Sequence, residues 1–250
     1  MTFNDLGLSK ETVQAIEELG ILRPTTVQAD VIPSVLEGKD IFTIAPQRSG
    51  KTYSYVFPLI DMIAKKTKQN ILVITADPAQ ANNVSDSFAV FNKYHPSDED
   101  DANVIIATPN LILELDAEQK LDLEHTDVLV VDDINLIKKK HQLANLEIIL
   151  EKLPSNKQNI VFTNRRSKET QSILDKILKT PTEIKVDRTK EDEAQMAKET
   201  LAEGENKAPK PFVAQTAEFD SEALEYVQKF HVFGDKTPHF LLIKGALKRY

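Results

Sequence analysis

The stretch "IFTIAPQRSGKTYSYVF", residues 41–57, predicts the fold of this chain. It opens with a short apolar run typical of a buried strand, and a loop then leads into a segment with helical spacing. The loop ends in Gly50-Lys51-Thr52, which at a strand-to-helix junction is the ending of a phosphate-binding loop. Arg48 stands inside the loop, where small residues are normal. The stretch therefore predicts a phosphate-binding loop with an altered centre.

Other apolar runs extend this strand into a sheet. They are continuous rather than alternating, which indicates strands buried on both faces. With the first run, they cover residues 40–45, 70–76, 103–108, 127–132 and 159–163, and residues 182–186 add an edge strand. Helical spacing lies between them at residues 51–65, 78–91, 142–152 and 167–178. Alternating strands and helices predict an α/β fold with an open parallel sheet covered by helices.

Two further helices are expected ahead of the first strand. Ser9 is a good N-cap for one that ends at Gly20, and the second covers residues 26–36. We expect one domain over residues 1–187, an acidic linker over residues 188–211, and a strand-and-helix tail over residues 212–250.

The composition excludes several classes of protein. The 250 residues carry a net charge of −8, which disfavours strong nonspecific binding to nucleic acid. The chain has no cysteine, which excludes disulfides and thiolate metal sites. No apolar run approaches the roughly 20 residues that span a bilayer, and the N-terminus is not a secretory signal. We expect a cytoplasmic protein that does not bind membranes.

Acidic residues follow the fourth long strand. In a parallel sheet, ligands bind at the carboxyl ends of the strands, where Asp132 and Asp133 stand. Beside a phosphate-binding loop, such a carboxylate is the usual second group at a magnesium site, and the Thr52 hydroxyl is the first. The alternative is that the two aspartates cap the next helix. The sequence leaves both interpretations open.

The opening of the chain resembles a known family. Phe3, Gly20, Pro24-Thr25 and Gln28 are similar to the Q motif of DEAD-box RNA helicases, and residues 2–186 resemble the N-terminal RecA-like domain, a P-loop NTPase fold. The tail resembles the start of the second domain, so we expect the arginine that the rest of that domain supplies to be missing.

The resemblance implies a site for ATP or ADP with Mg²⁺. Phe3 and Gln28 would contact adenine, Thr52 and Asp132 would hold Mg²⁺ through water, and Asp132 and Asp133 would be the catalytic residues. The expected nucleotide-binding residues are Phe3, Arg23, Gln28, Arg48, Ser49, Gly50, Lys51 and Thr52.

The sequence departs from the family pattern mainly at residues expected to bind RNA and at residues expected to take part in catalysis. Pro78 and Leu111 stand where phosphate-contacting arginines are expected, and Asn110 replaces the glycine at a helix start. Asp77 and the acidic run at residues 98–101 would repel a phosphate backbone. Asp133 replaces a glutamate. Asn135 and Arg165 are expected to break the link between the ends of the fourth and fifth long strands that couples hydrolysis to RNA binding in the family.

These departures favour a degenerate helicase-like protein that binds nucleotide with little or no hydrolysis. It would act as a sensor or docking module with a protein or ribonucleoprotein partner, would bind RNA weakly through the family path, and would have no DNA specificity. The alternatives are an active ATPase completed by a partner or second copy, and a structural domain with an empty pocket. Basic residues 138–140 and 165–166 would form a new RNA contact or, alternatively, solvated helix ends.

Overall fold

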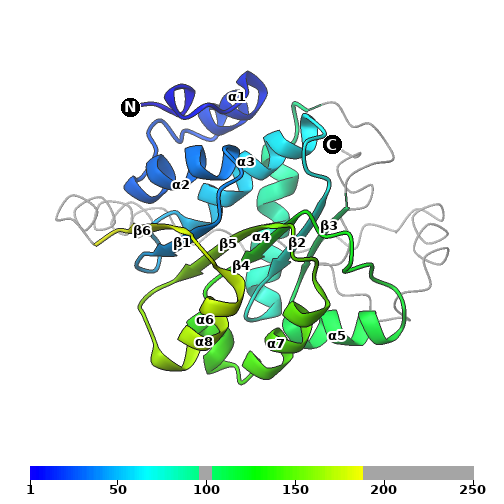
Figure 1. The fold of residues 1–250 in the computed structure, drawn as a ribbon. Coiled ribbons are helices and arrows are strands. Elements are labelled where there is room, and N and C mark those ends of the chain that lie inside the picture. The colour runs from blue at the N-terminus through cyan, green and yellow to red at the C-terminus, as the bar shows by residue number, and fades with distance from the viewer. Residues whose placement is uncertain (96–102, 188–250) are drawn as a thin grey trace, which may run out of the picture. The chain divides into compact units, whose positions relative to one another are not determined.

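A six-stranded parallel sheet forms the centre of the protein (Figure 1). The structure is a computed structural model, and it describes residues 1–95 and 103–187. The strands lie in the order β3-β2-β4-β5-β1-β6. Their bounds are β1 Ile41–Ile44, β2 Asn70–Ile74, β3 Asn103–Ala107, β4 Val128–Val131, β5 Gln158–Thr163 and β6 Thr182–Lys185. The predicted α/β fold is confirmed, because each apolar run forms a strand and residues 182–186 supply the edge.

Helices cover both faces of this sheet. They are α1 Lys10–Glu18, α2 Thr26–Leu36, α3 Lys51–Ala64, α4 Pro78–Phe91, α5 Pro109–Ala117, α6 Ile134–Lys139, α7 Leu143–Lys152 and α8 Lys168–Ile177, and a short 3-10 helix, η1, spans Phe3–Leu6. Helix α5 was not among the predicted helices, although Thr108 and Pro109 are typical residues for a helix start. None of the helices in the described ranges is long and apolar enough to cross a bilayer.

Two hydrophobic cores follow from the alternation of side chains along the strands. Ile41 and Ile71 point to the core that α1–α4 cover, whereas Phe42 and Leu72 point to the core that α5–α8 cover. Because both faces are covered, the strands read as continuous apolar runs in the sequence. The carboxyl ends of the strands are left free to carry a site. The predicted acidic linker and C-terminal tail lie outside the described residues.

A buried polar cluster ties the N-terminal helix to the centre of the domain. Asp61 of α3 is 0% exposed, and its carboxylate accepts hydrogen bonds from the hydroxyls of Ser9 at 2.7 Å and Thr12 at 2.5 Å. Ser9 also accepts from the Thr12 amide, which confirms it as the cap of α1. Nε2 of His95, just after α4, lies 2.7 Å from the Thr12 hydroxyl. The Asp61 carboxylate and the Thr12 hydroxyl thus join α1, α3 and the segment after α4.

We predict that Asp61→Ala destabilises the domain by roughly 3 kcal/mol, because the substitution leaves buried donors without their charged acceptor. Urea unfolding followed by circular dichroism measures the change. Asp30→Ala is the control, because Asp30 is an exposed aspartate within α2 and its loss should change the free energy of unfolding by less than about 0.5 kcal/mol. Equal losses in both variants would contradict the prediction.

Candidate functional site

The loop between β1 and α3 is held against the start of α2. Gly50 has φ 85°, and a Cβ there would lie 2.7 Å from Nε2 of Gln28 and 2.8 Å from the Thr25 hydroxyl oxygen. The hydroxyl of Thr25 donates to the Ser49 carbonyl at 2.9 Å, and the hydroxyl of Ser49 donates to the Pro46 carbonyl at 2.8 Å. Glycine is therefore required at position 50 both by backbone conformation and by close packing.

Arg48 also adopts a left-handed backbone, with φ 62°. A side chain in this conformation costs roughly 1 kcal/mol, a cost that glycine avoids. The Arg48 side chain is exposed. The loop therefore keeps the backbone conformation of a glycine position but carries a cation there.

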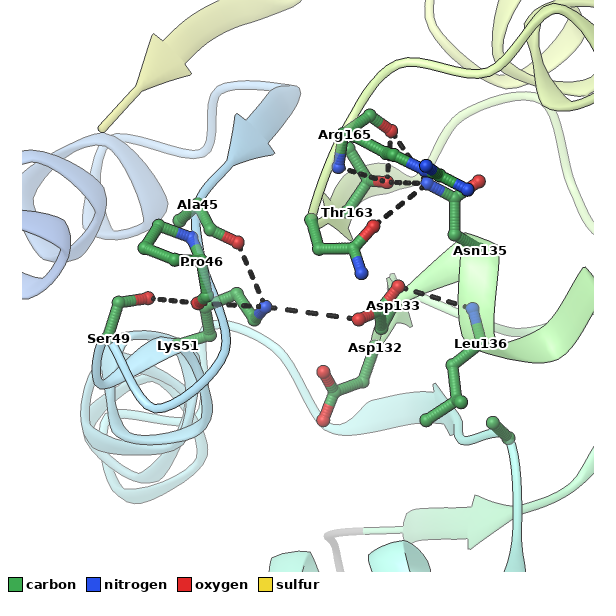
Figure 2. Close-up of polar contacts among 12 residues, drawn as sticks. Ala45, Pro46, Ser49, Lys51, Asp132, Asp133, Asn135, Leu136, Thr163 and Arg165 are labelled. Atoms are coloured by element: carbon green, nitrogen blue, oxygen red, sulfur yellow. Dashed lines mark hydrogen bonds and ion pairs between the residues drawn. The ribbon is translucent and has the colours of Figure 1, made fainter. Parts of the chain in front are cut away.

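Lys51 places a buried positive charge behind the loop (Figure 2). Its side chain is 9% exposed, and Nζ donates to the carbonyls of Ala45 at 3.1 Å and Pro46 at 3.3 Å. Nζ also lies 3.9 Å from Oδ2 of Asp133, at the end of β4. An ammonium group at the N-terminus of α3, which itself favours negative charge, suits the binding of an anion.

Asp132 is buried beside Tyr55. It is 2% exposed, and the Tyr55 hydroxyl donates to its Oδ2 at 3.0 Å. Burial raises the pKa of Asp132 to about 6, and burial followed by the charge of Asp132 raises the pKa of Tyr55. At neutral pH, Asp132 is an ionised carboxylate in a poorly hydrated position. Such a group suits a divalent cation, directly or through water.

Asp133 has a different role from Asp132. It adopts φ 64°, is 4% exposed, and its Oδ1 accepts from the Leu136 amide at 3.3 Å as the N-cap of α6 (Figure 2). The sequence left two roles open for the aspartate pair, magnesium binding and helix capping. For Asp133, helix capping is confirmed. Asp132 faces Tyr55 instead, which leaves it available for a ligand.

Asn135 joins the ends of β4 and β5. Its Nδ2 lies 2.8 Å from the Thr163 hydroxyl oxygen, 3.1 Å from Oδ1 of Asn164 and 2.7 Å from the Arg165 carbonyl (Figure 2). A contact between these strand ends is therefore kept, and the loss of coupling between hydrolysis and RNA binding that Asn135 and Arg165 are expected to cause stays a prediction. The asparagine amide donates where a carboxylate could only accept, and the backbone at position 165 supplies an acceptor that does not depend on its side chain.

The residues expected to contact adenine lie in the interior. Phe3 is 2% exposed and packs edge-to-face on Phe57, with ring centroids 5.8 Å apart. Gln28 is also 2% exposed, and its Oε1 accepts from the Thr25 amide at 2.9 Å while its Nε2 donates to the Gly50 carbonyl at 3.4 Å. Arg23 is exposed in the segment before α2. The structure thus brings Gln28 to the loop, places Phe3 in the core and leaves Arg23 at the surface.

The carboxyl ends of β2 and β3 carry an internal polar network. Asp77 caps α4 by accepting from the Gln80 amide at 3.0 Å, and it lies 3.6 Å from the Lys140 ammonium. Gln142 donates to the Ala76 carbonyl at 3.4 Å and accepts from the Asn110 amide at 3.4 Å. The polar groups at this edge of the sheet bond to one another. The expected acidic run at residues 98–101 lies outside the described residues.

A cavity of about 610 Å³ opens beside the loop. Arg48, Gly50 and the first three residues of α3, Lys51, Thr52 and Tyr53, form one wall. The opposite wall is one face of α4, whose residues Asn83, Asp86, Ser87 and Val90 have i, i+3, i+4, i+7 spacing. Sequence reasoning missed this face because it mixes polar and apolar side chains. The helical spacing itself was the available signal.

The raised pKa of Asp132 predicts a pH-dependent cost of folding. The folded domain keeps the Asp132 proton up to about pH 6 and the unfolded chain loses it near 3.8, so rising pH lowers stability across that interval. Asp132→Asn should therefore raise the free energy of unfolding at pH 7.5 by roughly 3 kcal/mol, and most of this gain should be lost at pH 4. Urea unfolding at both pH values measures this, with Asp30→Asn as the exposed control; a gain independent of pH would contradict it.

Comparison with known proteins shows the family and the fold to which this chain belongs. A family model described as DEAD/DEAH box helicase matches residues 25–173. The chain is 26% identical over 205 residues to the ATP-dependent RNA helicase DeaD of Haemophilus influenzae, a match that covers 74% of this chain and 33% of that protein. It is 25% identical over 205 residues to the RNA helicase CrhR of Synechocystis, a match that covers 75% of this chain and 42% of that protein. The chain thus spans a third to two-fifths of the length of these relatives.

Solved structures share the fold. A crystal structure of a DEAD box protein from Methanococcus jannaschii matches with a TM-score of 0.70 at 21% identity, covering 92% of this chain and 70% of that chain. A hypothetical ATP-dependent RNA helicase from Sulfolobus tokodaii matches with a TM-score of 0.64 at 22% identity, and the match covers 72% of this chain and 57% of that chain. The parallel sheet with helices on both faces is thus a RecA-like fold. Because the family model matches more than half of its residues, the chain belongs to the DEAD/DEAH box helicase family and contains the N-terminal RecA-like domain of a DEAD-box helicase-like protein.

Proposed function

We propose that this domain binds ATP or ADP with Mg²⁺, hydrolyses ATP slowly or not at all by itself, and acts as a nucleotide sensor or docking module in RNA or ribonucleoprotein metabolism. The observation that carries the proposal is the different use of two neighbouring carboxylates. Asp132 is buried beside Tyr55 of α3 and caps no helix, whereas Asp133 caps α6 and lies 3.9 Å from the Lys51 ammonium.

The donor set fits a magnesium nucleotide. Lys51 and the N-terminus of α3 would hold phosphate oxygens, with Ser49 and Gly50 forming the loop around them. Thr52 and Asp132 would hold Mg²⁺ through water. The described ranges contain no cluster of three or more His, Cys, Asp or Glu side chains that could bind a metal alone, so the phosphates would complete the coordination. The bound ion would neutralise charge on the phosphates.

The length and the fixed position of the Asp133 side chain support slow hydrolysis. Its side chain is one methylene shorter than the glutamate of the family motif, and the Leu136 amide fixes one of its oxygens. A misplacement of about 1 Å in a group that positions an attacking water can cost on the order of a hundredfold in rate. The alternative of an active enzyme completed by a partner or a second copy remains a hypothesis that a turnover assay decides.

RNA binding through the family path is expected to be weak. Asp77 presents a carboxylate at this edge, and Lys140 is paired with it. Other basic side chains nearby are also paired, since Lys138 lies 2.8 Å from Glu169 and Arg166 forms an ion pair with Glu183. Paired cations neutralise fewer nucleic-acid phosphates, so a protein or ribonucleoprotein surface is the partner that we favour.

Nucleotide binding without turnover is the central expected outcome. With ATP and Mg²⁺ at a hundred times the dissociation constant, the domain should gain roughly 2.7 kcal/mol of stability, and phosphate release should stay at background. Differential scanning fluorimetry and a phosphate-release assay with and without RNA measure the two quantities. Lys51→Ala should lose the thermal shift. Robust RNA-stimulated turnover would contradict the slow-enzyme proposal, and no thermal shift in the unmodified chain would favour the structural alternative.

Arg48→Gly should have opposite effects on stability and on affinity. Removing the left-handed arginine should stabilise the domain by about 1 kcal/mol. Losing its charge should weaken ATP binding about tenfold or more, because a charge-assisted hydrogen bond contributes roughly 1.5 kcal/mol or more. Urea unfolding and isothermal titration calorimetry measure the two changes.

Gln47→Gly is the matched control, because Gln47 is the exposed neighbour in the same loop. It should leave ATP affinity within about twofold. Tighter ATP binding by Arg48→Gly would mean that the arginine obstructs the phosphates instead of contacting them.

A further inference from the structure

Asn164 follows the strand that separates the phosphate-binding loop from the two aspartates. Strand β5 lies between β4 and β1 in the sheet. The carbonyl of Thr163, the last residue of β5, accepts from the amide of Ala45, the first residue after β1, at 3.0 Å. Asn164 therefore leaves the sheet between the loop that follows β1 and the pair Asp132-Asp133 that follows β4.

The orientation of the Asn164 amide is fixed by Asn135. Nδ2 of Asn135 lies 2.7 Å from the carbonyl oxygen of Arg165, which can only accept, so the amide nitrogen of Asn135 must stand there. The same nitrogen donates to Oδ1 of Asn164 at 3.1 Å. The oxygen of the Asn164 amide is thus the atom that faces Asn135, and the Asn164 nitrogen is directed elsewhere.

The Asn164 nitrogen has two N–H donors that the protein does not use. In the part of the chain that the structure describes, no atom accepts a hydrogen bond from this nitrogen. Asn135, which holds the amide in place, is 5% exposed and anchored at three points, whereas Asn164 is half-buried. A donor that is fixed by a buried neighbour and has no acceptor in the protein suits an oxygen of a ligand.

The charges near this strand end favour a neutral donor. Nζ of Lys51 lies 3.9 Å from Oδ2 of Asp133, and Figure 2 shows both side chains on the same edge of the sheet as Thr163 and Asn135. A phosphate oxygen here would be attracted by the ammonium and repelled by the carboxylate. An amide N–H adds a hydrogen bond to such an oxygen without changing the balance of charge.

The proposed nucleotide would bring a phosphate to this edge. The family resemblance places the base on the α2 side of the loop, and Thr52 and Asp132 would hold Mg²⁺ at the start of α3 and the end of β4. The phosphates would then run from the loop toward the ends of β4 and β5. The last phosphate of ATP would lie closest to Asn164, and ADP would lack it.

From these observations we propose that Asn164 donates a hydrogen bond to the terminal phosphate of ATP and makes the site prefer a nucleoside triphosphate to a diphosphate. This inference rests on the proposed nucleotide-binding function. Because Asn164 is bonded to Asn135 of α6, contact with the terminal phosphate would also be felt at the start of that helix. The pair gives the proposed sensor a means to distinguish ATP from ADP without a second domain.

The first test compares ADP with β,γ-imido-ATP, an ATP analogue that is not hydrolysed, on the full chain. Isothermal titration calorimetry in Mg²⁺ gives both dissociation constants, and their ratio reports the contribution of the terminal phosphate. Asn164→Ala should lower the preference for the triphosphate about tenfold, because one hydrogen bond to a charged group is lost. The affinity for ADP should change less than about twofold, because ADP does not reach this residue.

The matched control is Asn145→Ala on α7. Asn145 is another half-buried asparagine, and its side chain bonds to Asn110 at 2.7 Å, so its loss should leave the preference unchanged. An unchanged preference in Asn164→Ala would overturn the inference, while measurable ADP binding would still support the proposed function. A preference that Arg165→Ala removes and Asn164→Ala keeps would also overturn it, because the exposed arginine would then be the contact. Binding of neither nucleotide would overturn both proposals.

A second test observes the Asn164 amide directly. Its side-chain signals in a ¹⁵N–¹H correlation spectrum are assigned by their absence in Asn164→Asp. Their positions should differ between the ADP and the β,γ-imido-ATP complexes of the unmodified chain, and the side-chain signals of Asn145 should not. Identical Asn164 signals in the two complexes would show that the amide does not meet the terminal phosphate.

Discussion

The buried ammonium of Lys51 is the constraint around which the carboxyl edge of the sheet is organised. Burying a charge costs several kcal/mol unless partners surround it, and here the partners come from two different strands. The carbonyls of Ala45 and Pro46 follow β1, and the carboxylate of Asp133 follows β4, with β5 lying between them in the sheet. The lysine therefore fixes the loop, and Asp133 is held between the start of α6 and this charge.

The same edge shows how motif residues serve the fold itself. Asp133 caps α6, Asp77 caps α4, and Gln28 closes the cap of α2 while bonding to the loop. A cap contributes about 1 kcal/mol to helix stability, so each residue has a structural role that does not require a ligand. Asp132 differs, since burial raises its pKa to about 6 and its ionised form is unfavourable without a cation. This contrast separates Asp132, which caps no helix, from the residues that stabilise the domain as helix caps.

The position of the cavity connects these two sets of groups. It begins at the loop that Lys51 holds and extends along α4, whose first turn is fixed by Asp77. Because α4 is anchored at both ends, by this cap and by the buried Phe88 and Phe91, its outer face presents Asn83, Asp86 and Val90 in a defined arrangement.

The sequence by itself determined the sheet, most of its helices and the identity of the loop. Short continuous apolar runs rich in β-branched residues indicate strands covered on both faces, and local signals such as Ser9 and Gly50 mark helix boundaries within a few residues. Only the tertiary structure decided which polar groups pair. Tyr55 meets Asp132 across 77 positions, Asn135 reaches the Arg165 carbonyl, and α4 closes a cavity with the loop. Such contacts depend on strand order and helix packing, which bring distant segments together without leaving a pattern in the local sequence.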